Sequence, residues 1–432
     1  MNKLPEQKIR VSSKRTPDKI RLLTSEDLLN FESRSTESES KLPIQKLIIN
    51  GLLSFGEETE FEFGALNILV GPNGSGKSNL IDCVRIFRYV PFDIQKAFEK
   101  SGFEDWLFNG IDKQTGTAFI QAVTNVPEIP TKIHHQIKFG QPVKSRARLE
   151  EIVFGNVSEN EPVDFYFIGS YRSEPVLSTI GSGKRRKERK LNSNEYDSFR
   201  SILSQIRDAG QYPEITKLAN LYASFRIYSE WSFGRKSNLR ESTPAGRSDT
   251  TLSESMDDLA LALNSLEKTA AHDKIRTLLQ ELKETYRDFV TRIIFGRVGL
   301  ELVEAPFEIP LPADRLSDGT LRFLALAAIL FQPNPPPLIC LEEPELGMHP
   351  DMIRMVAKMI VEAAAKTQLI VSTHSEYLLS ALQDDFDVLF AFDNGLTGSV
   401  VRRFTKDEYK NWQEEHTLGE LWTSGELGGN RW

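Results

Sequence analysis

The segment Leu66-Asn67-Ile68-Leu69-Val70-Gly71-Pro72-Asn73-Gly74-Ser75-Gly76-Lys77-Ser78 joins a mostly apolar run to a glycine-rich turn. The apolar run predicts a buried strand, and the pattern from Asn79 to Tyr89 predicts a helix. The turn between them matches G-x-x-x-x-G-K-[ST]. Its glycines allow successive backbone N–H groups to face phosphate oxygens, and the helix start adds the positive end of its dipole. The segment therefore predicts an α/β protein that grips a nucleotide.

Each residue of this turn has an expected role in binding ATP and Mg²⁺. The phosphates are expected to contact the backbone of Asn73, Gly74, Ser75 and Gly76. Lys77 would place a charge on the β- and γ-phosphates, and the Ser78 hydroxyl would ligate the metal. The alternative is a glycine-rich turn with a solvated lysine. The strand before the turn and the helix after it favour the phosphate site.

A second apolar run ends in two carboxylates. Pro337-Leu338-Ile339-Cys340-Leu341 predicts a buried parallel strand, and Glu342-Glu343 follow it. Ligands of open α/β sheets bind at the carboxyl ends of such strands. We expect Glu342 to hold Mg²⁺ through water and Glu343 to polarise the attacking water. An acidic solvated turn is the alternative, and the phosphate site argues against it.

A third strand, Leu369-Ile370-Val371, runs into Ser372-Thr373-His374. A histidine at that strand end can donate a hydrogen bond to the γ-phosphate and sense its loss. Ahead of the acidic strand, Leu316-Ser317-Asp318-Gly319-Thr320 precedes a helix, where Ser317 and the backbone near Gly319 would present donors. The same pentapeptide is also an ordinary helix-capping turn.

These motifs in this order resemble the ABC-class ATPase heads of the SMC and RecF group, over about residues 41–432. The resemblance extends to a D-loop-like Pro344–Pro350, to Tyr228–Gly234 and to two tail segments, Leu418–Trp422 and Gly425–Gly429, which look like a bacterial AAA-type branch. It implies an ABC-type P-loop fold with a mixed sheet lobe and an inserted helical lobe. It also implies that Ser317 and Gly319 of one copy seal the ATP held by another, so that ATP joins a head-to-tail dimer.

The chain departs from that family pattern in three features, and the glutamine lid of the family has one candidate here. The signature reads Ser-Asp-Gly instead of the Ser-Gly-Gly of transporters, and Glu342 stands where an aspartate is usual. The early loop Asn50–Phe55 lacks the basic residue of many relatives. Gln205 is the candidate for the glutamine lid and its contact with the metal.

The chain texture predicts four parts: a mobile leader over 1–40, an ATPase lobe over 41–195, a helical lobe over 196–300 and a second ATPase lobe over 301–432. Strands are expected at 46–50, 60–63, 117–123, 133–139 and 165–168. Two apolar stripes at helical spacing mark the third part. One comprises Met256, Leu259, Leu263 and Leu266, and the other Ile275, Leu278, Leu282, Tyr286 and Phe289.

Composition limits the class of protein. The chain has 432 residues, a net charge of −8 and two cysteines, Cys83 and Cys340, which are expected to be reduced core residues of a cytosolic protein. No apolar run approaches the roughly 20 residues that span a bilayer, which excludes a transporter with its membrane part in this chain. The polar start predicts no secretory signal. The run Lys184–Lys190 is either a solvated loop or a contact for nucleic acid or an acidic partner.

Three functions are compatible with this sequence. The first is a bacterial anti-phage defence ATPase that dimerises or forms a larger assembly and controls a separate nuclease or toxin, as the resemblance to ATPase subunits of defence systems implies. The second is a RecF-like repair ATPase that binds DNA directly. The third is a nucleotide-locked scaffold that hydrolyses ATP too slowly to cycle.

Overall fold

The computed structural model describes residues 42–109, 118–155, 164–170, 173–180, 186–192, 194–232, 234–246, 251–410 and 417–425. The predicted leader over 1–40 and the end of the tail motif lie outside these residues. The chain forms two compact units, which are Met1–Glu62 with Cys83–Ala223, and Phe63–Asp82 with Ser224–Trp432. Helix α2 (Lys77–Tyr89) contributes to both units.

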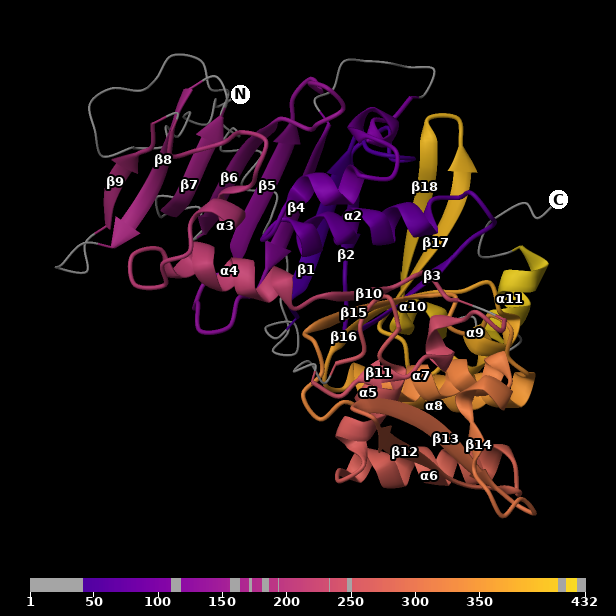
Figure 1. The fold of residues 1–432 in the computed structure, drawn as a ribbon. Helices are drawn as coiled ribbons and strands as arrows, with labels where there is room; N and C mark the ends of the chain where they lie inside the picture. Colours follow the sequence, from indigo (N-terminus) through magenta and orange to yellow (C-terminus); the bar gives the residue numbers. More distant parts are fainter. Residues whose placement is uncertain are drawn as a thin grey trace. The chain divides into compact units, whose positions relative to one another are not determined.

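The first unit is built on an antiparallel sheet of eight strands in the order β2-β1-β4-β5-β6-β7-β8-β9 (Figure 1). The strands are β1 (Ile44–Asn50), β2 (Thr59–Glu62), β4 (Phe119–Thr124), β5 (Ile133–Phe139), β6 (Leu149–Gly155), β7 (Asp164–Ser170), β8 (Ser173–Ile180) and β9 (Arg186–Lys190). Its helices are η2 (Ile94–Phe98), η3 (Phe103–Trp106), α3 (Ile202–Gln205) and α4 (Pro213–Ala223). Helix α4 packs on β5, where the rings of Tyr222 and His135 stack with centroids 5.7 Å apart.

The second unit is built on a six-stranded sheet in the order β10-β15-β16-β3-β17-β18. The strands are β3 (Leu66–Val70), β10 (Arg226–Tyr228), β15 (Leu338–Glu342), β16 (Gln368–Ser372), β17 (Val388–Gly395) and β18 (Gly398–Thr405). All neighbouring pairs are parallel except the hairpin β17–β18. Every residue of β3 and β16 is buried, as expected for parallel strands covered on both faces.

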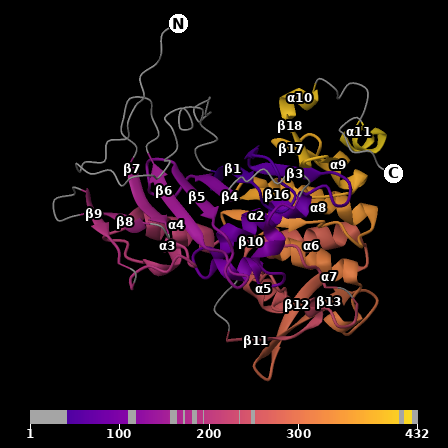
Figure 2. The same ribbon diagram turned by 90° about the horizontal axis from the view of Figure 1, so that it is seen from above.

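Several helices of this unit precede or follow the strands of this sheet. They are α7 (Asp318–Leu330), α8 (Pro350–Ala364), α9 (Glu376–Leu382), α10 (Lys406–Lys410) and α11 (Leu418–Ser424). Helix α7 packs against α8, as Figure 1 shows, and Figure 2 gives the same helices seen from above. Nearly all of α7 is buried, because its sequence after the first turn is almost continuously apolar.

A small antiparallel sheet in the same unit corrects one prediction. It contains β11 (Thr243–Pro244), β12 (Tyr286–Ile294), β13 (Arg297–Glu304) and β14 (Leu311–Pro312), and it packs with α5 (Leu259–Leu266) and α6 (Ala270–Leu282). The predicted helical stripe from Ile275 to Phe289 is right only as far as Leu282. Lys283 is extended, and Tyr286 and Phe289 lie in β12. The spacing of apolar residues stays compatible with a helix across this junction, but β-branched residues after 289 favour a hairpin strand.

The two units also differ from the predicted lobes. The phosphate-binding segment 63–82 belongs with the C-terminal residues, because β3 pairs in parallel with both β16 and β17. Cys83 and Cys340 are both buried and reduced, as predicted. In the part of the chain that the structure describes, no helix has the length and apolarity to cross a bilayer.

Candidate nucleotide site

Strand register brings three of the predicted motifs to one edge of the parallel sheet. Glu342 pairs with Ser372, and Ser372 pairs with Leu69, so β15, β16 and β3 end at the same level. The glycine-rich turn, the two glutamates and the switch histidine each follow one of these ends. All of them lie in the second compact unit.

The glycine-rich turn is shaped by close backbone packing. A Cβ added to Gly71 would lie 2.6 Å from the carbonyl oxygen of Phe392 in β17. At Gly74 the space is open, but φ is +76°, a region that favours glycine. The Ser399 hydroxyl of β18 donates to the carbonyl of Ser75 at 2.6 Å. The hairpin β17–β18 therefore supports the turn from behind, a contribution that the motif alone did not reveal.

Lys77 lies at the start of α2 with its ammonium folded onto the turn. Nζ donates to the carbonyl oxygens of Gly71 at 2.8 Å and Pro72 at 3.0 Å. Burial lowers the pKa of Lys77 to about 8, although Glu343 and Glu342 oppose this shift. The ammonium is thus partly desolvated and adjacent to the predicted phosphate position.

Ser78 and Glu342 meet across the two motifs that carry them. The Ser78 hydroxyl donates to Oε1 of Glu342. Mg²⁺ is commonly held by one or two protein oxygens together with substrate phosphates and water, so a hydroxyl and a carboxylate side by side fit that ion. When bound, the ion would neutralise developing phosphate charge.

Glu343 and His374 also lie together. His374 Nε2 is 3.5 Å from Oε1 of Glu343. Burial and the charge of Lys77 lower the pKa of His374, and Glu343 acts in the opposite direction. Glu343 has a positive φ of +45° and its N–H donates to the carbonyl of Ser372. The turn after β15 is thereby fixed against the end of β16, which aims a carboxylate and an imidazole at the same place.

Residues 66–380, more than half of the chain, match the family described as "AAA domain, putative AbiEii toxin, Type IV TA system". The chain belongs to this AAA family.

Two curated relatives of the chain are chromosome partition proteins named Smc. The chain is 26% identical over 258 residues to the chromosome partition protein Smc of Desulfitobacterium hafniense (strain Y51), covering 56% of this chain and 21% of that protein. It is 25% identical over 161 residues to Smc of Fusobacterium nucleatum subsp. nucleatum, covering 36% and 13%. The chain therefore spans about a fifth or less of these relatives' length.

Two solved structures share the fold. One is an Smc head bound to the C-winged helix domain of ScpA, with a TM-score of 0.55, 16% identity, and coverage of 85% of this chain and 99% of that one. The other is an Smc head with a coiled coil and joint from Pyrococcus yayanosii, with a TM-score of 0.51, 13% identity, and coverage of 86% and 99%. The chain therefore has the α/β fold of ABC-type P-loop heads, as the motifs predicted.

In this AAA head, Glu345 fixes the loop that carries His374. It follows Glu343 by two residues and is buried. Its Oε1 accepts from the Thr373 hydroxyl and from the N–H of His374, the latter at 3.3 Å. Burial raises the pKa of Glu345 despite these hydrogen bonds. Sequence reasoning placed Glu345 only within the D-loop-like segment and assigned it no role.

Arg322 of α7 is a second residue that sequence reasoning missed. It is 1% exposed and donates to the carbonyls of Leu346, at 2.7 Å, and Glu343. Its guanidinium lies 4.1 Å from the ring centroid of Trp231, whose indole N–H donates to the carbonyl of Glu342 at 2.8 Å. Burial lowers the pKa of Arg322 to about 10, opposed by Glu345 and Glu343. The arginine joins the signature helix to the acidic turn. The apolar run around Arg322 was the only signal of its burial.

The signature loop of the AAA head begins α7. Ser317 is the N-cap residue, and its hydroxyl oxygen accepts from the N–H of Thr320 at 3.1 Å. Ser317 itself is exposed, while Gly319 is half-buried. The capping alternative is therefore realised within one chain, and a role toward a second copy stays a prediction.

Gln205 belongs to the first compact unit. Its amide nitrogen donates to the carbonyls of Asp197, at 3.1 Å, and Arg200, at 2.9 Å, and its Oε1 accepts from the N–H of Asp197. These contacts give Gln205 a local structural role. Its assignment as a lid that contacts the metal stays a prediction without support from these contacts.

The basic run is only partly within the described residues, since Lys184 and Arg185 fall outside them. Arg186, Arg189 and Lys190 of β9 form ion pairs with Glu214, Glu195 and Glu174 respectively. Three of its charges are therefore balanced by acidic neighbours within the unit. The prediction of a solvated loop is wrong for residues 186–190, because they form the exposed strand β9, and the ion pairs argue against a free basic surface.

Proposed function

We propose that this ATPase head binds ATP with Mg²⁺, dimerises around two ATP molecules and hydrolyses them. The observation that carries the proposal is the meeting of three pairs of groups at one sheet edge: Lys77 with the turn, Ser78 with Glu342, and Glu343 with His374. A phosphate grip, a hydroxyl–carboxylate pair and a carboxylate–imidazole pair are what hydrolysis of a phosphoanhydride needs.

Within this proposal the residues divide the work. Lys77 and the backbone of the turn bind the β- and γ-phosphates. Ser78 and Glu342 would hold Mg²⁺. Glu343 accepts a proton from the attacking water, and His374 hydrogen-bonds the γ-phosphate while it remains neutral near pH 7, since its pKa is lowered. The exposed Ser317 of one copy seals the ATP of the other.

Replacement of the proposed base tests the catalytic part. Glu343→Gln should lower steady-state turnover by roughly 10²- to 10⁴-fold, the usual contribution of a general base, while ATP affinity changes little. The variant should accumulate as an ATP-bound dimer in light scattering with size exclusion. Undiminished turnover in Glu343→Gln would overturn the catalytic assignment.

We further propose that the head controls a separate effector, a nuclease or toxin, in bacterial anti-phage defence. Support comes from the family's description, which names a toxin and a toxin–antitoxin system. The test is a plaque assay on cells that carry the gene in its native operon. Protection should be lost both in Lys77→Ala and on deletion of the neighbouring gene. Protection that survives loss of the neighbour would contradict a separate effector.

The same preparations separate the remaining functions. Salt-sensitive DNA binding that is lost when the basic residues of Lys184–Lys190 are neutralised would favour direct DNA repair. The ion pairs of β9 argue against it. ATP retained through purification, with an assembly indifferent to Glu343→Gln, would favour a nucleotide-locked scaffold.

A further inference from the structure

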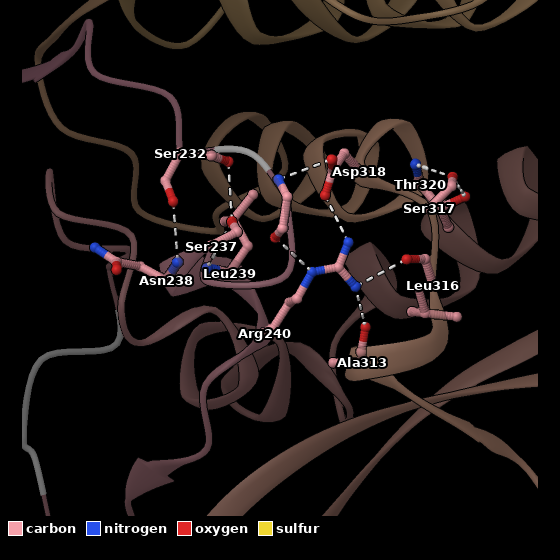
Figure 3. Close-up of polar contacts among 11 residues, drawn as sticks. Ser232, Ser237, Asn238, Leu239, Arg240, Ala313, Leu316, Ser317, Asp318 and Thr320 are labelled. Carbon is pink, nitrogen blue, oxygen red and sulfur yellow. Dashed lines mark hydrogen bonds and ion pairs between the residues drawn. The ribbon is translucent and has the colours of Figure 1, made fainter.

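The signature loop contains a carboxylate that its own chain binds. Asp318 is the first residue of α7. Its Oδ2 accepts from the N–H of Gly234 at 2.9 Å, and its Oδ1 accepts from Nη2 of Arg240 (Figure 3). Burial alone would raise the pKa of Asp318, but these two partners outweigh it and hold that pKa below its ordinary value. Asp318 is therefore ionised at neutral pH.

Arg240 holds the whole base of the loop, not only this carboxylate. Its side chain is 9% exposed. Nη1 donates to the carbonyls of Ala313 and Leu316, both at 2.8 Å, and Nε donates to the carbonyl of Gly234 at 3.0 Å. Figure 3 shows the guanidinium in the middle of these acceptors, with Ser317 immediately beyond them.

A short 3-10 turn, η4 (Asn238–Arg240), places this arginine. Ser237 is its N-cap and accepts from the N–H of Leu239, whose side chain is buried. The Ser237 hydroxyl donates to the carbonyl of Ser232 at 2.9 Å, and the N–H of Asn238 donates to the Ser232 hydroxyl at 3.1 Å. Arg240 is thus delivered from an anchored turn, because both serines fix the backbone ahead of it.

The charge of Asp318 conflicts with the role proposed for its loop. A loop that closes over the triphosphate of a second copy brings any carboxylate near several negative charges, and like charges at an interface strongly disfavour association. Here a guanidinium lies directly on the carboxylate and cancels its charge.

We propose that Arg240 is the positioning residue of the signature loop: it neutralises Asp318 and fixes the backbone that presents Ser317 to the ATP of a second copy. This rests on the proposed function, in which that loop completes the active site of another chain. Arg240 itself acts through Asp318 and the loop backbone, and it needs no contact with nucleotide.

The test is a double-mutant cycle on the full chain. Arg240→Ala should lower turnover and ATP-driven dimerisation at least about tenfold, because the bare carboxylate repels the partner's nucleotide, while ATP affinity of the monomer is unchanged. Adding Asp318→Asn, which removes the charge but keeps an acceptor for Gly234, should restore part of both. Arg240→Lys should lie between wild type and Arg240→Ala. Measurements are ATP turnover, dimer fraction and monomer ATP binding.

Two results would overturn the role of Arg240. One is wild-type turnover and dimerisation in Arg240→Ala. The other is a defect that Asp318→Asn leaves untouched, which would reduce Arg240 to a structural residue. Failure of Glu343→Gln to dimerise with ATP while Arg240 is intact would instead overturn the proposed function itself.

Discussion

At the scale of single residues, Lys77 carries its charge in a position that burial disfavours. Because its pKa is about 8, the Lys77 amine is neutral in more than half of the molecules above that pH. Triphosphate binding favours the ammonium, so the bound and free states bind protons differently. The pKa of His374 is lowered below its ordinary value by burial and by the charge of Lys77.

ATP affinity should therefore fall at alkaline pH. Below about pH 7 Lys77 is already charged, whereas above about pH 8 binding must take up a proton, and the Kd should rise by nearly tenfold per pH unit. Calorimetry in buffers of different ionisation enthalpy measures the proton uptake directly. Lys77→Arg stays charged throughout and is the control, with no proton uptake from this position. Absence of uptake at about pH 9 in the wild type would contradict the assignment.

Two glycines of the same turn should respond differently to alanine. At Gly71 a Cβ would lie 2.6 Å from the Phe392 carbonyl, so the turn or β17 must move, at a cost of about 3 kcal/mol. At Gly74 a Cβ meets nothing within 4 Å and costs only the strain of positive φ, about 1 kcal/mol. Urea denaturation of Gly71→Ala and Gly74→Ala measures the difference. Equal effects would show that contact with β17 does not shape the turn.

At the scale of elements, α7 connects the signature loop with the acidic turn after β15. Its first turn carries the signature loop, and one turn further on Arg322 binds the carbonyls of Glu343 and Leu346 beneath Trp231. A movement of the acidic turn therefore cannot occur without changing contacts of the signature helix. Tertiary packing makes this connection, because Arg322 of α7 contacts the turn that follows β15.

Removing the arginine should loosen this connection. Arg322→Leu removes a charged donor from two part-buried carbonyls, although the Glu343 carbonyl still accepts from the N–H of Leu346, and should destabilise the protein by roughly 1–3 kcal/mol. It should also lower turnover, because the backbone of Glu343 loses a support. Trp231→Phe keeps the aromatic face and loses only the donor to Glu342, at a cost of about 1 kcal/mol. Thermal unfolding and turnover check both variants, and an unchanged melting temperature in Arg322→Leu would contradict this account.

At the scale of the whole molecule, the proposed active site is completed only by two copies. Ser317 is exposed and caps its own helix, so it is available to a second chain without loss of the cap. In each chain, Lys77 would then bind that chain's own ATP, and Ser317 would contact the ATP bound by the other chain.

Complementation tests this arrangement. Lys77→Ala and Ser317→Arg should each abolish turnover, the latter with monomer ATP binding intact. An equal mixture should recover about a quarter of wild-type activity, since half of the dimers are mixed and each mixed dimer has one intact site. Ser317→Gly, which removes the hydroxyl without adding bulk, controls for loss of the cap. A mixture as inactive as its components would overturn the shared site.

The sequence by itself determined the fold class and the motifs that meet at the proposed site. Three of the motifs are local patterns, in which a short apolar strand runs directly into the residues of the proposed site. They are the glycine-rich turn, the paired glutamates and His374. Periodicity misled only where spacing fits both structures, as between Leu282 and Phe289, where the chain turns from helix to strand.

Tertiary structure alone decided which distant residues support those motifs. Arg240 meets Asp318 across 78 positions of sequence, and Trp231 meets Glu342 across 111. The placement of segment 63–82 with the C-terminal strands likewise depends on parallel pairing over some 300 residues. No local pattern encodes such contacts, because a buried arginine or an indole donor has many possible partners in the sequence until packing selects among them.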